Sequence, residues 1–248
     1  MKILFRSYSN HLGLPFILMC LSMGFAQLAT AIESYKAEYQ AEIKGLNVRM
    51  HRSFTVDDNA VAINMKAQKL IFKITESSTL QLEEDGQLRA LSYQHKRRNL
   101  GDRHDRSLVF DWANNQVSDG LRPDQGALDI QYPMYDKVSY QEQFRLDLMA
   151  NPEQTRFEYQ TTDGRSSKLY AFDRVGEERI ETPLGVLDTV KFKRDRGSDS
   201  PRETYIWFAK DWNYLLAQLD QIKDGKLERL VIRKASIGNR TVQGKPRD

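Results

Sequence analysis

Histidine is the first residue type to examine for chemistry, because it supplies metal ligands and acid–base groups near neutral pH. His51, His95 and His104 are the histidines that follow residue 31, and none stands in an H-x-H or H-x-x-x-H pair. His104 lies next to Asp105 and near Asp102, so a weak metal site is conceivable, although a solvated turn explains the same residues. We therefore expect no metal site and no cofactor.

Motifs for nucleophilic or phosphate chemistry are absent. The sequence contains no G-x-S-x-G elbow, no S-x-x-K and no glycine-rich phosphate loop. Acidic pairs such as Glu83-Glu84 stand beside a turn and resemble solvated charge, although carboxylates from distant strands could still meet in the fold. The sequence thus favours a non-enzymatic protein and leaves a hydrolase as an alternative.

The densest charge in the chain is the basic run that begins at His95. Its candidate site residues, which could bind an anionic headgroup or an acidic partner, are Lys96, Arg97, Arg98 and Arg103. The alternative is a charged hairpin whose side chains protect a strand edge from aggregation. The aromatic interleaving that stacks nucleotides is missing, so we expect no nucleic-acid partner.

Aromatic residues are frequent in the segments that resemble strands. Core packing is the simplest explanation for them. A second interpretation is an apolar cavity inside a curved sheet or open barrel, which could hold an acyl chain or another lipid. The candidate lining residues of such a cavity are Trp112, Phe192, Tyr205 and Trp207.

The elements that must position these residues are mostly strands. Apolar residues alternate with polar ones from Tyr35 to Ile43, which is the period of a half-buried strand, and similar runs recur along the chain. Two of the runs that we expect to be strands are 167–174 and 179–182. Turn pairs separate the runs and supply the positive φ angles of tight hairpins: Asp58-Asn59, Asp85-Gly86, Asn114-Asn115, Asp163-Gly164 and Asp224-Gly225.

One segment breaks this pattern and predicts a helix. Residues 136–150 are rich in helix formers, with Asp136 as a plausible N-cap and Asn151-Pro152 as a stop. The predicted fold class is therefore mainly β: an antiparallel curved sheet or incomplete β-barrel with one short helix near residues 136–150.

The N-terminus is typical of an exported protein. Lys2 and Arg6 precede the apolar stretch 12–21, and Ala29-Thr30-Ala31 has the small residues of a signal-peptidase site. We expect residues 1–31 to be a cleavable signal peptide and the protein to be periplasmic, with a retained membrane anchor as the alternative. We expect one β-rich domain over 32–237, a polar tail over 238–248 and no membrane span after cleavage.

Removal of the signal peptide changes which chemistry is available. It takes away Cys20, the only cysteine, and two of the 37 basic residues, leaving 35 basic against 34 acidic residues. A nearly neutral chain has no general attraction for nucleic acid or anionic lipid, and a chain without cysteine has no thiol chemistry.

The C-terminal half resembles a known family. Thr182-Pro183-Leu184-Gly185-Val186-Leu187-Asp188-Thr189-Val190, followed by Arg194 and Arg196, and the block from Thr204 to Trp212 are similar to motifs of the exported bacterial domain of unknown function 3108. The resemblance implies an envelope location, a β-rich fold and no settled activity. It also implies that Pro183 and Gly185 shape a turn and that Trp207 fills the core, while Lys210 stands where a proline is common.

Three hypotheses about function follow. The first is a non-enzymatic envelope protein that binds an apolar or amphiphilic ligand, such as a lipid, within the curved sheet. The second is a structural or assembly factor that contacts another envelope protein through the basic hairpin. The third is a hydrolase of an envelope polymer.

Overall fold

The computed structural model describes residues 32–43, 46–69, 72–99 and 102–247, so the predicted signal peptide lies outside the described residues. Within them, strands dominate. In chain order they are β1 Tyr35–Ile43, β2 Leu46–Asp57, β3 Ala60–Lys69, β4 Phe72–Leu82, β5 Leu88–Asn99, β6 Asp102–Asp111, β7 Gln116–Asp119, β8 Ala127–Asp129, β9 Arg156–Thr162, β10 Ser167–Thr182, β11 Gly185–Asp195, β12 Arg202–Ala209, β13 Leu215–Lys223, β14 Lys226–Ile237 and β15 Arg240–Thr241.

All of these strands belong to one antiparallel sheet. Its order is β8-β7-β6-β5-β4-β3-β2-β1-β14-β13-β12-β11-β10-β9, with β15 added to β14. Consecutive strands are neighbours in the sheet except for β8 and β9, and β1 also pairs with β14. The edge strands β8 and β9 do not pair with each other in the described chain, so the sheet curves without closing into a barrel. This confirms the predicted fold class.

The predicted turns connect the strands as expected. Asp58, Asn115 and Asp224 have φ angles of 51°, 54° and 49°, which short polar side chains tolerate. Residues 167–174 and 179–182, which we expected to be separate strands, form the single strand β10 instead. A bulge between Arg174 and Gly176 interrupts the register there, so the polar break in the pattern is an irregularity within one strand.

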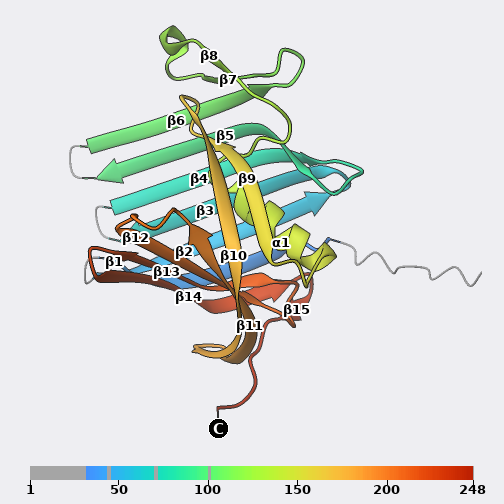
Figure 1. Ribbon diagram of the computed structural model, residues 1–248, viewed down its shortest axis with the longest axis vertical. Coiled ribbons are helices and arrows are strands. Elements are labelled where there is room, and N and C mark those ends of the chain that lie inside the picture. The colour runs from blue at the N-terminus through green and yellow to red at the C-terminus, as the bar shows by residue number, and fades with distance from the viewer. Residues whose placement is uncertain (1–31, 44–45, 70–71, 100–101, 248) are drawn as a thin grey trace, which may run out of the picture. The chain divides into compact units, whose positions relative to one another are not determined.

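The helices of the described chain are the α-helix α1 (Ser139–Ala150) and the short 3-10 helix η1 (Pro123–Gln125). Figure 1 shows α1 between the β1–β6 part of the sheet and strands β9 and β10. We call the sheet face that carries α1 the inner face and the opposite one the outer face. No helix of the described residues is long and apolar enough to cross a membrane.

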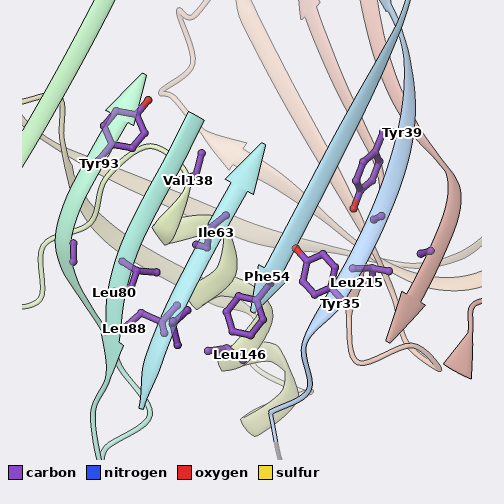
Figure 2. Close-up of a cluster of buried hydrophobic side chains, with 14 of the residues drawn as sticks. Tyr35, Tyr39, Phe54, Ile63, Leu80, Leu88, Tyr93, Val138, Leu146 and Leu215 are labelled. Carbon is purple, nitrogen blue, oxygen red and sulfur yellow. The ribbon is translucent and has the colours of Figure 1, made fainter. Parts of the chain in front are cut away.

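The larger hydrophobic cluster lies under α1. Figure 2 shows Phe54, Ile63 and Leu80 of successive strands pointing at Val138 and Leu146 of the helical segment. All five side chains are buried. The sheet and the helix therefore pack into one core, and this core fixes α1 against β1–β5.

Candidate ligand-binding site on the inner face

The start of α1 is tied to the sheet by Asp136. One carboxylate oxygen accepts the backbone amides of Val138 and Ser139 at 2.8 and 3.0 Å, and the other accepts the Ser78 hydroxyl at 2.5 Å. The helix begins at Ser139, later than predicted, and this carboxylate satisfies the amides of Val138 and Ser139 at its start, which have no partner within the helix. Burial raises the pKa of Asp136.

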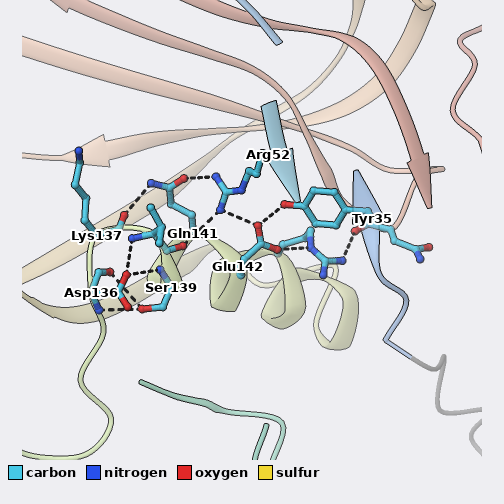
Figure 3. Close-up of polar contacts among 10 residues, drawn as sticks. Tyr35, Arg52, Asp136, Lys137, Ser139, Gln141 and Glu142 are labelled. Carbon is cyan, nitrogen blue, oxygen red and sulfur yellow. Dashed lines mark hydrogen bonds and ion pairs between the residues drawn. The ribbon is translucent and has the colours of Figure 1, made fainter. Parts of the chain in front are cut away.

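A buried ionic cluster joins α1 to β1 and β2 (Figure 3). Arg52 Nη2 lies 2.7 Å from Glu142 Oε1, and Arg145 Nε donates to Glu142 Oε2 at 2.9 Å. The Tyr35 hydroxyl also donates to Glu142 Oε1. Arg52 Nη1 donates to Gln141 Oε1 at 2.6 Å, so one strand arginine binds two consecutive helix residues.

This cluster carries a net positive charge in the protein interior. The side chains of Arg52 and Arg145 are each 4% exposed, and that of Glu142 is 2% exposed. Burial raises the pKa of Glu142, but the two guanidinium groups outweigh burial, so this pKa lies below its usual value. Burial raises the pKa of Tyr35 well above its usual value, so its hydroxyl stays neutral. Two cations thus share one carboxylate.

Some donors of the cluster lack partners. Arg52 Nε and Arg145 Nη2 make no hydrogen bond within the described chain, and neither does the nearby buried hydroxyl of Tyr39. A buried charge or polar group without a partner is costly, so an interior of this kind favours an added acceptor.

A small cavity adjoins both arginines. Its volume is about 20 Å³, which is enough for one water-sized group. Its lining also includes the apolar residues Ile206, Phe208, Leu216 and Leu219. Leu216, Leu219 and Tyr140 keep some solvent exposure, so the cavity is not sealed from the outside.

An apolar strip continues the inner face beyond Arg52. We define the inner apolar strip as Met50, Met65, Ala67, Phe72 and Ile74. Met65 pairs with Arg52 across β2 and β3, and Met50 and Ile74 both pair with Ala67. All five are only partly buried although they share a face with the core residues Phe54 and Ile63. The strip is therefore an accessible apolar surface beside the buried arginines.

Glu76 closes the strip towards α1. Its side chain is wholly buried, and its Oε1 lies 2.7 Å from His95 Nδ1 and 2.5 Å from Lys137 Nζ. Burial alone would raise the pKa of Glu76. The contacts with His95 and Lys137 have the larger, opposite effect and bring this pKa down to about 2. The carboxylate stays ionised and ties Lys137, two residues before α1, to β4.

The other side of α1 packs into aromatic residues. The Phe144 ring lies 4.8 to 5.0 Å, centroid to centroid, from the rings of Phe157, Phe172, Phe192 and Phe208. These rings come from β9, β10, β11 and β12 and belong to the second hydrophobic cluster. This half of the inner face is filled by side chains.

The comparisons with known proteins identify the family. The family model DUF3108, described as a protein of unknown function, matches residues 28–230. The chain belongs to this family. The resemblance of its C-terminal motifs is thereby confirmed, and no curated protein matches the chain.

Two solved structures are similar to this DUF3108 chain. One is described as a "beta-barrel-like protein of domain of unknown function DUF1849" from Brucella abortus; it is 11% identical, covers 84% of this chain and 99% of its own, and gives a TM-score of 0.56. It supports the β-barrel-like fold. The other, a "putative lipoprotein" from Parabacteroides distasonis, is 14% identical and covers 82% of this chain and 95% of its own, with a TM-score of 0.33.

The DUF3108 motif around Gly185 has a structural explanation. Gly185 has a φ of 109°, and a Cβ on it would lie 2.7 Å from the carbonyl oxygen of Lys245. Val186 exchanges backbone hydrogen bonds with Lys245, so the C-terminal segment lies directly on this turn. A glycine is needed here because the two backbones touch.

The structure does not bring the four aromatic candidates together. Phe192 is wholly buried on the inner face. Tyr205 and Trp207 lie on the outer face, because Phe192 pairs with Ile206 between them, and Lys191 Nζ lies 4.6 Å from the Trp207 ring centroid. Trp207 is among the buried hydrophobic residues, as the resemblance implied, but it belongs to neither of the two hydrophobic clusters.

The fourth aromatic candidate, Trp112, packs elsewhere. It follows β6 and stacks on Phe110 at 6.0 Å between ring centroids, and its indole donates to the carbonyl of Ala90 at 2.6 Å. Its partners are those of a packed residue at the edge of the larger cluster.

The basic candidates also divide between the two faces. Lys96 and Arg98 point outward, and Arg98 Nη1 lies 2.6 Å from Asp105 Oδ1. Arg97 points inward over the ring of Phe72, 5.9 Å from its centroid. Arg103 pairs with Arg98 in the register of β5 and β6, but its side chain lies outside the described part of the chain.

Sequence reasoning missed the ionic cluster. The signal that could have found it is the pair Glu142 and Arg145, which stand three residues apart on the predicted helix among residues that are buried. Nothing in the sequence links them to Arg52, because that contact depends on how the helix lies on the sheet. The buried carboxylates Asp136, Glu142 and Glu76 all accept bonds from the protein's own groups.

Proposed function

We propose that this protein binds a single-chain amphiphile with an anionic headgroup on the inner face of its curved sheet. The observation that carries the proposal is the pair of buried guanidinium groups that share one carboxylate. An anionic head at Arg52 and Arg145 balances the charge and supplies an acceptor for the two N–H groups that lack one.

The tail of the ligand has an apolar surface beside this head site. The inner apolar strip begins at Met65, the cross-strand partner of Arg52, and runs towards Ile74 and Phe72. Methionine side chains adapt to differently shaped apolar partners, which suits an acyl chain. A head in the cluster and a tail along the strip use neighbouring surfaces of β2, β3 and β4.

The expected compartment agrees with such a ligand. We infer export from the basic, apolar and small-residue pattern over 1–31, most of which lies before the family match begins at residue 28. A protein of the bacterial periplasm meets acyl chains from the membranes on both sides. Catalysis is not part of the proposal.

The test compares two amphiphiles of the same chain length and opposite charge. The delipidated protein is titrated with hexadecanoate and with hexadecyltrimethylammonium, and each dissociation constant is measured by calorimetry. We expect hexadecanoate to bind at least about tenfold more tightly, since a desolvated charge-assisted contact is worth about 1.5–3 kcal/mol. Equal affinity for the two, or no binding of hexadecanoate, contradicts the proposal.

The matched variants are Arg52→Met and Arg165→Met. Arg52→Met leaves Arg145 and Glu142 as a balanced pair, so the domain should fold while losing affinity for hexadecanoate. Arg165 is exposed in a turn and makes no ion pair in the described chain, so its substitution should leave the affinity unchanged. Equal affinities of the two variants would place the headgroup elsewhere.

A further inference from the structure

A large hollow lies on the outer face; Arg52 and Met65 also border it, although the strand register turns their side chains to the inner face. Its volume is about 730 Å³, and it crosses six adjacent strands: β14, β1, β2, β3, β4 and β5. The strand register arranges its outward side chains in two rows that run across the strands. No aromatic side chain lines it.

The first row is mainly basic. It runs from Lys234 through Glu38, His51, Lys66 and Thr75 to Lys96, each paired with the next in the strand register. The second row is polar and holds one more lysine, Lys36, followed by Ser53, Asn64, Ser77 and Gln94. Ammonium groups thus line one side of the hollow, and hydroxyl and amide groups line the other.

The lysines of the hollow carry charge that the protein does not balance. None of Lys36, Lys66, Lys96 and Lys234 forms an ion pair with a carboxylate of the described chain. Glu38 is the acidic residue that points into the hollow, and it already pairs with Arg233 at 3.2 Å. The hollow is therefore complementary to negative charge.

The strands under the hollow and the side chains that line it exclude some classes of ligand. Every strand under the hollow pairs with a neighbour on both sides, so no free strand edge is available to a peptide. The side chains that point into the hollow are lysine, serine, threonine, asparagine, glutamine, histidine and glutamate, so its outward ends are polar or charged. Lys66 and Lys96 stand two strands apart, roughly 10 Å, which is comparable with the disaccharide repeat of an extended glycan.

We propose that this outer hollow binds an acidic polysaccharide chain laid across strands β14 to β5. The lysines of the first row contact the anionic groups of the chain, and the hydroxyl and amide side chains of the second row bond its sugar hydroxyls. This site is separate from the inner face and does not depend on the amphiphile proposal.

The test uses a carboxylated oligosaccharide and two lysine triples. The full chain is titrated with oligogalacturonate at low and moderate salt. The triple variant Lys66→Gln, Lys96→Gln and Lys234→Gln should weaken binding about tenfold. The control triple Lys168→Gln, Lys223→Gln and Lys226→Gln removes the same charge from exposed positions outside the hollow and should change affinity far less.

Three results would overturn the inference. They are no measurable binding of oligogalacturonate, equal losses in the two triple variants, and equally tight binding of poly-L-glutamate with the same dependence on the three lysines. Arg52→Met should leave oligogalacturonate binding unchanged, and the hollow triple should leave hexadecanoate binding unchanged. The failure of one proposal is therefore distinguishable from the failure of the other.

Discussion

The two sides of α1 are attached to the sheet in different ways. Towards β9–β12, Phe144 inserts among four phenylalanine rings and the space is filled. Towards β1 and β2, Glu142 and Arg145 meet Arg52 and Tyr35 in a buried ionic cluster beside a cavity. One side of the helix is thus fixed by aromatic packing, and the other side is fixed by ionic contacts.

This difference separates stability from binding. The close-packed aromatic rings fill the space between α1 and β9–β12, so this side of the helix leaves no room for a ligand. The ionic cluster holds two cations against one anion and keeps donors without acceptors, which is why we propose that an anion from outside the chain binds there. Under this proposal, a ligand should change the stability of the protein most on the polar side of α1.

The largest loss of stability should come from removing an aromatic ring on the packed side of α1. Phe144→Ala removes the ring at the centre of the second cluster and should lower the free energy of unfolding by about 4 kcal/mol, the size of a large core cavity. Urea unfolding monitored by tryptophan fluorescence measures the change. Phe144→Leu serves as the control and should cost clearly less. If both substitutions cost below 1 kcal/mol, the aromatic cluster does not hold the helix.

The next effect concerns charge balance on the polar side. Glu142→Gln leaves Arg52 and Arg145 buried without a carboxylate and should cost about 3 kcal/mol of unfolding free energy. Arg145→Met leaves a balanced pair and should cost less in the same urea experiment. Hexadecanoate should recover part of the stability of Glu142→Gln, because it supplies the missing anion. The reverse order of the two variants would refute this description of the cluster.

A third effect, which depends on pH and is at most as large as that of Glu142→Gln, belongs to Glu76. Its pKa in the folded protein is about 2, below the usual 4.5, so its stabilising contribution is complete above pH 4.5 and is lost as the pH falls towards 2. The full contribution is about 3 kcal/mol at most. Glu76→Gln should therefore lower stability at pH 7 and converge with the parent protein near pH 2. Glu84→Gln, at an exposed position, should show no such convergence.

Much of the fold could be predicted from the sequence because its signals are local. Alternation within a strand depends only on the backbone period, and the turn pairs mark places where φ becomes positive, as at Asp58 and Asp224. The helix was predicted from its helix-forming composition and from the Asn151-Pro152 pair that ends it, and Asn151 is indeed its C-cap. The helix starts later than predicted, and Asp136 bonds the amides of its first residue, Ser139, and of the residue before it.

The site could not be predicted because it depends on register and on contacts between distant residues. Period two shows that Tyr205 and Trp207 share a face, but only the pairing of Phe192 with Ile206 shows that Phe192 lies on the other face. The bond from Tyr35 to Glu142 spans 107 residues. The two polar rows of the outer hollow likewise exist only once six strands are aligned.

The most direct test of the central claim follows the headgroup of the bound ligand. Hexadecanoate labelled with ¹³C at its carboxyl carbon is bound to the protein, and its NMR signal is followed from pH 8 to pH 4. A carboxylate beside Arg52 and Arg145 should stay ionised, so its chemical shift should remain constant across this range, and Arg52→Met should abolish that behaviour. A bound carboxyl group that titrates as the free acid does, identically in both proteins, would contradict the claim.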